Sequence, residues 1–300
     1  MKKFELTSEF KIDLSGRKLF RIKALIDIER YDVKACYLGG WVEKEDNLSQ
    51  NGDAWVYGNA QVSGNAKVSG NAKVSGDAEV SGDAQVCGNA WVSGNAQVCG
   101  NAKVCDDAWV YGNAKVYGNA QVSGNAQVSG NAKVSGDAEV CDNAWVSGNA
   151  QVSGNAKVRV DAWLYGNAKV YDDAWVSGDA WVSGNAQVSG NVKVSGNAKV
   201  SGNAKVYDDA KVSGDAKVSG NADYATIKGF GTVYRTTTFF RCQDGAVRVT
   251  CGSFYGTIDE FREQIKRTRE GKVADEYLKI ADLMEYHFEK KKEFKMEEYL

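Results

Sequence analysis

A six-residue unit repeats without interruption over residues 54–221, and this repeat limits the chain to very few folds. The unit reads Ala-x-Val-Ser-Gly-Asn and occurs 28 times. Because side chains alternate between the two sides of a strand, Ala and Val face one way while x and Ser face the other. Gly and Asn both tolerate left-handed backbone angles, so they predict a bend. Each unit is therefore a short strand followed by a corner, and such strands bury their apolar face only if successive units coil and stack.

The repeat Val-Ser-Gly-Asn-Ala-Lys resembles the hexapeptide motif of left-handed parallel β-helix proteins, with an aliphatic residue at the first position and a small residue at the fifth. The resemblance implies an all-β solenoid in which three consecutive units form one triangular coil. The left-handed sense of the coil also comes from the resemblance. The repeat then gives about nine coils, and at about 4.8 Å per coil the rod is about 45 Å long. We expect backbone hydrogen bonds and stacked Asn amides at the corners to hold the coils together.

When the sequence is aligned in coils of three units, most of its tryptophans fall on one side of the rod. Six of the eight lie in a single outward column, whereas Trp175 lies on another side and Trp41 precedes the repeat. In the same strands, Tyr replaces Ser at intervals of three coils. The other outward columns contain chiefly Lys, Gln and Glu, so one side is aromatic and two are polar. The candidate binding or interface residues are Trp55, Tyr57, Trp91, Trp109, Tyr111, Trp145, Trp163, Tyr165 and Trp181.

Two interpretations of this aromatic side remain open, because it is larger than the apolar patch that a monomer normally exposes to water. In the first, the side is covered within the chain or by an identical subunit. Many left-handed β-helix proteins form trimers through their flat faces, so the resemblance implies the same here. In the second, the side binds a foreign partner, since aromatic ladders stack on sugar rings, bases or other aromatic groups.

Residues 1–53 precede the first unit and predict an N-terminal cap of β-structure. Residues 18–28 are typical of a strand, and Gly39-Gly40-Trp41-Val42 leads toward the first coil. The stretch over residues 32–50 resembles the N-terminal cap of YdcK-like hexapeptide-repeat proteins, which occur in bacteria and phages and are largely without assigned activity. We expect the cap to block edge pairing of the first coil.

Residues 222–300 follow the repeat and predict a small α+β region. Asp244-Gly245 is typical of a tight hairpin turn between strands at residues 236–243 and 246–251. Thr257 and Glu260 form a capping box that begins a helix ending near Gly271. A second helix is expected at about residues 273–292. Its apolar stripe consists of Tyr277, Ile280, Leu283, Met284, His287 and Phe288.

The second helix has about the length of the tryptophan column. Twenty helical residues span about 30 Å, and seven coil steps span about 34 Å. We therefore hypothesise that this helix, from the same or a neighbouring chain, lies on the aromatic side. The C-terminal tail also resembles C-terminal segments of uncharacterised phage repeat proteins.

The sequence argues against catalysis. The family that the repeat resembles includes acyltransferases, which typically use a His in the coils, and γ-type carbonic anhydrases, which bind zinc through three His. This chain has one histidine, His287, outside the repeat. We therefore predict no catalytic residue, no metal and no cofactor. Carboxylate pairs at three corners are capable of holding calcium, but Asp is more simply a residue that tolerates the bend. These pairs are Asp106-Asp107, Asp172-Asp173 and Asp208-Asp209.

Seven cysteines without metal spacing favour free thiols in a reducing compartment. Cys87 and Cys105 stack one coil apart, at a distance compatible with a disulfide. Cys in place of Ser is more simply a small surface residue, so we expect both to be free thiols.

The charge balance excludes partners that need a strong field. Net charge is −2, and the repeat holds 13 Lys and Arg against 15 Asp and Glu, which disfavours nucleic acid and DNA mimicry. There is neither an apolar run long enough for a membrane span nor a signal-peptide stretch at the start. We expect a soluble, cytoplasmic protein of a bacterium or a phage-infected cell, without a membrane partner.

The sequence thus predicts a non-catalytic scaffold or binding protein that forms a homo-oligomer, a trimer in the leading interpretation, through its aromatic side or its C-terminal helices. The first alternative is a phage-type sequestering protein that binds a small molecule or a host protein at clefts between subunits. The second alternative is a divergent acyltransferase.

Overall fold

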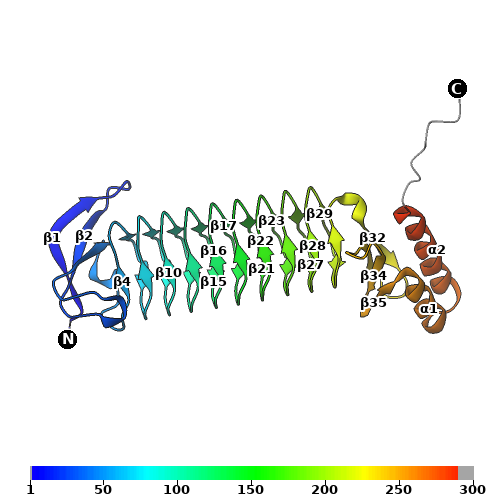
Figure 1. Ribbon diagram of the computed structural model, residues 1–300, viewed down its shortest axis with the longest axis horizontal. Coiled ribbons are helices and arrows are strands. Elements are labelled where there is room, and N and C mark those ends of the chain that lie inside the picture. The colour runs from blue at the N-terminus through cyan, green and yellow to red at the C-terminus, as the bar shows by residue number, and fades with distance from the viewer. Residues whose placement is uncertain (1, 290–300) are drawn as a thin grey trace, which may run out of the picture.

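The computed structural model describes residues 2–289 and forms a long rod that is closed differently at its two ends (Figure 1). The rod contains 28 strands of two residues each, from β4 (Trp55–Val56) to β31 (Lys217–Val218). Each strand consists of the variable residue and the aliphatic residue of one repeat unit, and consecutive strands begin six residues apart. The strands are short because the Gly-Asn corner follows almost at once.

The strands form three parallel sheets, because each strand pairs with the third strand after it. Trp91, for example, pairs with Trp109 of the next coil. The aromatic sheet runs from β4 to β31, and the third sheet from β6 (Lys67–Val68) to β30 (Lys211–Val212). The cap sheet consists of β1, β2 and β3, followed by every third strand from β5 to β29 (Lys205–Val206). The predicted all-β solenoid with three repeat units per coil is confirmed, whereas its left-handed sense stays a prediction.

The interior of the rod is filled by the two apolar positions of the repeat. All of these side chains, from Ala54 to Val218, have a relative exposure of 0%. Leu164 and Val192, which depart from the usual Val and Ala, are equally buried. Since the core is made of small side chains, any binding residue of the rod lies at an outward position.

The corners from residue 58 to residue 214 each depend on a residue with left-handed backbone angles, usually Gly. At Gly130 φ is 65°, and an added Cβ would lie 3.0 Å from both the N and the O atom of Gly148 in the next coil. Four Asp residues adopt the same conformation with φ between 59° and 63°, which confirms the interpretation of Asp as a bend residue. Val160 also has a φ of 60°, an angle that β-branched residues rarely adopt. The four are Asp106, Asp142, Asp172 and Asp208.

Asn side chains at the corners form ladders along the rod, as expected. Each Asn donates from Nδ2 to the Oδ1 atom of the equivalent residue in the next coil, and the longest ladder runs from Asn95 to Asn203 with distances of 2.9 to 3.1 Å. A ladder that reaches an Asp ends there, as at Asp107 and Asp137. A carboxylate accepts hydrogen bonds but has none to donate.

Cys87 and Cys105 form a disulfide between adjacent coils of the third sheet. Their Cα atoms are 4.6 Å apart, within the range that a disulfide requires. The expectation of free thiols is therefore wrong for this pair, because coil stacking alone places equivalent residues at bonding distance. The free thiols are Cys36, Cys99, Cys141, Cys242 and Cys251.

The N-terminal cap continues the rod. β1 (Phe4–Ile12) pairs antiparallel with β2 (Lys18–Ala24), β2 pairs antiparallel with β3 (Leu38–Val42), and β3 lies parallel to β5 (Gln61–Val62). Leu48 bridges to the first strand of the third sheet, so the cap supplies sides of an additional coil ahead of the first repeat unit. The open edge of the first coil is covered, as expected of a cap.

Lys3 fastens the start of the chain to the first coil. Its side chain is 2% exposed, and Nζ donates to the carbonyl oxygens of Ala54 at 2.8 Å and Gly52 at 3.1 Å. Burial lowers the pKa of this lysine to about 8, although the charge of Asp53 acts in the opposite direction.

A four-stranded antiparallel sheet lies beyond the last coil. Arg241 pairs with Val247 across the Asp244-Gly245 turn, which confirms the predicted hairpin. The sheet contacts the rod through Lys211, whose backbone oxygen accepts a hydrogen bond of 2.9 Å from the Thr250 hydroxyl. The strands are β32 (Tyr224–Phe230), β33 (Arg235–Arg241), β34 (Val247–Cys251) and β35 (Phe254–Thr257).

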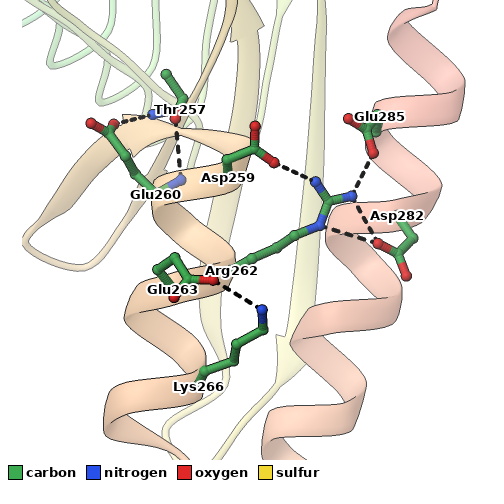
Figure 2. A network of polar contacts seen from close by, with 8 residues as sticks. All are labelled: Thr257, Asp259, Glu260, Arg262, Glu263, Lys266, Asp282 and Glu285. Atoms are coloured by element: carbon green, nitrogen blue, oxygen red, sulfur yellow. Dashed lines mark hydrogen bonds and ion pairs between the residues drawn. The ribbon is translucent and has the colours of Figure 1, made fainter.

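Two helices follow, α1 (Ile258–Thr268) and α2 (Gly271–Phe288). The capping box at the start of α1 is confirmed, since the Thr257 amide donates to Glu260 Oε2 at 2.7 Å and the Glu260 amide donates to Thr257 Oγ1 at 3.2 Å (Figure 2). No helix within residues 2–289 is long and apolar enough to cross a membrane.

Arg262 joins the two helices (Figure 2). Its guanidinium contacts Asp259 in α1 at 2.8 Å, and Asp282 and Glu285 in α2 at 2.8 Å and 2.6 Å.

The hypothesis that α2 lies on the aromatic side is wrong for this chain. The helix packs on its own antiparallel sheet and on α1, at the end of the rod (Figure 1). That sheet offers the nearest apolar surface, with Phe239 and Val249 fully buried beneath the helices. Four residues of the predicted stripe are buried, but Leu283 and His287 are exposed, and the part of the predicted helix beyond residue 289 lies outside the described residues. The four are Tyr277, Ile280, Met284 and Phe288.

Candidate binding site on the aromatic sheet

The six tryptophans of the predicted column all lie on the aromatic sheet, each as the first residue of its strand. Trp175 lies on the third sheet, so the alignment of the sequence in coils of three units also predicted the position of this residue correctly. The strands concerned are β4, β10 (Trp91–Val92), β13 (Trp109–Val110), β19 (Trp145–Val146), β22 (Trp163–Leu164) and β25 (Trp181–Val182).

The first tryptophan of the column is not part of the exposed surface, which corrects the expectation for this position. Trp55 is 0% exposed because the cap covers it, and the Phe4 ring lies edge-on to the indole at a centroid distance of 6.4 Å. Tyr57, on the same strand, is half-buried and in edge-on contact with Tyr31 and Tyr37 of the cap at 6.3 and 6.4 Å. The interpretation that the chain covers its own aromatic side therefore holds for the first coil.

Four of the remaining aromatic residues on this sheet are open to solvent. Trp109 is 44% exposed, Trp163 and Tyr165 are 39% exposed, and Trp181 is 36% exposed. Trp91, Tyr111 and Trp145 are half-buried against the sheet.

Neighbouring rings of the column support one another. The Trp91 and Trp109 centroids are 5.2 Å apart with an interplanar angle of 66°. Trp163 lies between Trp145, at 5.2 Å and 60°, and Trp181, at 5.4 Å and 2°. Such contacts between offset or tilted rings are favourable. The rings form two groups, one of two and one of three tryptophans, and Gln127 lies between the two groups.

A shallow cavity of about 280 Å³ opens between these rings. Its lining has no charged side chain, and its hydroxyl groups come from Ser147 and Tyr165 alone. Engineered apolar cavities of about 150 Å³ bind benzene, so this one has room for an aromatic or aliphatic group. The sequence did not single out Ser147 or Leu164, although both lie beside predicted residues when the repeat is aligned by coil. The lining residues are Trp145, Ser147, Trp163, Leu164, Tyr165 and Trp181.

The arrangement repeats every three coils. A strand with Trp followed by Tyr two positions later begins at Trp55, again at Trp109 and again at Trp163. The first unit comprises Trp55, Tyr57, Asn71, Lys73, Asn89 and Trp91, and the second unit comprises Trp109, Tyr111, Asn125, Gln127, Asn143 and Trp145.

The tryptophan on the third sheet has different surroundings. Arg159 and Lys193 lie over the Trp175 ring at 5.5 and 5.6 Å. Glu139 accepts hydrogen bonds from Arg159 and from Lys157, the latter at 3.1 Å. Burial by itself would raise the pKa of the Glu139 carboxyl, but these hydrogen bonds hold it below its usual value. Trp175 thus belongs to a charged surface and is a suitable control for the aromatic sheet.

The histidine and the cysteines lie on elements other than the aromatic sheet. His287, the one histidine, is on the exposed side of α2. Within residues 2–289, no three His, Cys, Asp or Glu side chains come together in a metal-binding arrangement. Burial raises the pKa of the Cys141 thiol to about 11, so this thiol is protonated at neutral pH.

The fold defines the class of the protein, which is that of parallel β-solenoids built from short repeats. Within that class, residues 60–76, 84–100 and 120–136 match the family model of the YdcK β-solenoid repeat. These matches confirm the resemblance to YdcK-like repeat proteins that the sequence indicated. No curated protein matches the chain.

Proposed function

We propose that the protein is a non-catalytic scaffold that binds other molecules through the exposed part of its aromatic sheet and assembles with copies of itself. The observation that carries this proposal is the row of aromatic side chains from Trp91 to Trp181, interrupted in the tryptophan column by Gln127, on a rod whose other outward positions are chiefly polar or charged.

Burial of this row in a complex is favourable. The outward positions of the aromatic sheet carry no charge between residues 91 and 183, so no ion loses its hydration when a partner covers them. Trp91 Nε1 already donates to Ser75 at 3.1 Å, and Trp145 Nε1 donates to Ser129 at 3.4 Å. Apolar contact contributes about 25 cal/mol per Å², and aromatic pairs contribute about 0.5–1.5 kcal/mol more.

Two surfaces are suited to assembly with identical subunits. The first is the aromatic sheet itself. The second is the outer side of α2, where Leu283 is 56% exposed and Tyr286 is 75% exposed. The resemblance to trimeric β-helix proteins supports a trimer.

Light scattering tests the assembly. The wild-type mass is expected to be three times that of the 32.5 kDa chain, and a monomer would contradict this part of the proposal. Two variants locate the interface: one with Trp109, Trp145 and Trp163 changed to Ser, and one with Leu283 and Tyr286 changed to Ser. Trp175→Ser is the matched control, because Trp175 and Trp163 are both 39% exposed.

The aromatic cavity favours a second candidate, a protein that sequesters a small molecule. The cavity is apolar, and its volume of about 280 Å³ suits one or two fused rings. A metabolite screen against the wild type and the triple Trp variant tests this candidate. It predicts a defined ligand that the wild type retains and the variant loses; retention by both proteins would contradict it.

A further inference from the structure

The first unit of the aromatic sheet is occupied, and its occupant is a polypeptide segment. The 3₁₀ turn Glu29–Tyr31 of the cap places the Tyr31 ring edge-on to Tyr57 at 6.3 Å. The hydroxyl of Tyr31 donates to the backbone oxygen of Asn71, and the hydroxyl of Tyr57 donates to the backbone oxygen of Tyr31 at 3.3 Å. Arg30, which precedes the tyrosine, donates to Asn89 Oδ1 at 3.1 Å. The unit thus recognises a ring, a backbone carbonyl and a guanidinium together.

The second unit repeats the residues that make these contacts. Tyr111 stands where the first unit has Tyr57, and the corner pair Asn125 and Asn143 stands where the first unit has Asn71 and Asn89.

The internal hydrogen bonds of the two units also agree. Asn71 donates to Asn89 at 3.1 Å, and Asn125 donates to Asn143 at 3.0 Å. The tryptophan that completes each unit donates to a serine of the preceding coil. The second unit therefore has the same framework, but no segment of the described chain lies on it.

Charge in the second unit is better suited to a basic side chain than in the first. Gln127 stands in place of Lys73, whose Nζ lies 5.7 Å from the Tyr31 ring in the first unit. Asn143 donates to Asp161 Oδ1 at 3.0 Å, as Asn89 donates to Asp107 Oδ1 at 2.9 Å in the first unit, so both units have a carboxylate one coil beyond the position of the arginine. An incoming guanidinium meets a nearby carboxylate and no lysine at that position.

We propose that the second unit binds a segment of a partner protein that presents a tyrosine preceded by an arginine, as the first unit binds Arg30 and Tyr31. The proposal rests on the scaffold function and extends it. In this proposal a partner protein binds this part of the aromatic sheet, and identical subunits associate through the exposed side of α2. The hydroxyl of Tyr111, now 3.4 Å from Gln127 Oε1, donates to the partner backbone instead.

A peptide with the sequence of residues 28–38 and the change Cys36→Ser is a direct probe, because this segment is the occupant of the first unit. The full-length protein is titrated with the labelled peptide to millimolar concentration by fluorescence anisotropy. We expect saturable binding to the wild type, and binding weaker by about tenfold in Tyr111→Ser, which loses the aromatic pair and a hydroxyl donor. Ser is the usual residue at this position of the repeat, so the variant retains a normal repeat unit.

Two controls define the site. Tyr117→Ser changes a 39% exposed tyrosine at the same repeat position on the cap sheet, and it should bind the peptide as the wild type does. A peptide with the additional change Tyr31→Ala should bind the wild type as weakly as the normal peptide binds Tyr111→Ser.

Three results would overturn the proposal. The first is the absence of peptide binding, or equal binding to the wild type and Tyr111→Ser. The second is binding of N-acetyl-tyrosinamide as tight as that of the peptide, which would identify a free aromatic molecule as the ligand. The third is conversion of the oligomer to a monomer by Tyr111→Ser, which would show that an identical subunit covers the second unit. Only a monomeric wild type would contradict self-assembly, and peptide binding to that monomer would still support the present inference.

Discussion

The rod and the C-terminal region both enclose an apolar interior, but they do so in different ways. The rod packs Ala and Val in every coil, and each side chain meets its equivalent in the next coil. The C-terminal region depends on a few large side chains, among them Phe239, Phe261 and Tyr277, brought together from different elements of the chain. Stability is therefore spread evenly along the rod and concentrated at a few positions in the C-terminal region.

The largest effect is expected from Phe261→Ala. Phe261 is 1% exposed and contacts Phe239 and Tyr277 at centroid distances of 6.1 and 5.9 Å. Its removal should lower the free energy of unfolding of the C-terminal region by about 3–5 kcal/mol. Hydrogen exchange should show lost protection in α1 and α2 while the rod amides remain protected. Lys279→Ala, at an exposed position of α2, is the control. Simultaneous loss of protection in the rod would contradict the separate stability of the rod and the C-terminal region.

The next effect concerns the cap and depends on pH. The pKa of Lys3 is about 8 in the folded chain against its usual 10.5. Between these values the unfolded chain binds a proton that the folded chain does not, so stability from this group rises with pH and is lost as pH falls through 8. The full difference between the two pKa values corresponds to about 3 kcal/mol in the free energy of unfolding.

Comparison of the wild type with Lys3→Met isolates this contribution, because the other titrating groups are common to both proteins. The difference in their free energies of unfolding should shift in favour of the wild type between pH 7.5 and pH 10.5. A constant difference would show that Lys3 keeps its usual pKa.

A smaller effect is expected at a corner of the rod. Gly130→Ala places a Cβ against the next coil at a φ of 65°, and it should cost about 1–2 kcal/mol. Gly130→Asp should cost less, because Asp106 adopts this conformation at an equivalent corner and its carboxylate accepts from the Gly124 amide at 3.2 Å. Denaturant unfolding measures both, and an Asp variant less stable than the Ala variant would refute the role of the carboxylate.

The smallest effect is expected from Arg262→Met. The guanidinium contacts three carboxylates, but the side chains of Asp259, Asp282 and Glu285 are 85%, 69% and 53% exposed. Pairs of this exposure contribute less than about 1 kcal/mol. The loss in the free energy of unfolding should be smaller in high salt. A loss as large as that of Phe261→Ala would show that the ion pairs stabilise the C-terminal region as much as the aromatic core does.

The sequence predicted the rod well because its information is local and periodic. Alignment of the repeat by coil placed the tryptophan column on one sheet without any knowledge of tertiary contacts. It did not predict that Trp55 is buried or that α2 packs on the antiparallel sheet, because both depend on which distant segments meet. Strand β1 was missed, although Phe4, Leu6, Phe10 and Ile12 alternate, because the alternation breaks where the pairing with β2 shifts register.

The Asn ladders give the rod a chemical direction, since every amide points its donor toward the C-terminal coil. While the chain is being synthesised, a coil that ends within a ladder presents unpaired N–H groups on its growing edge. A coil that ends on Asp107 or Asp137 presents a carboxylate instead. Like charges on two such edges repel each other, which disfavours the end-to-end pairing of unfinished rods at these corners.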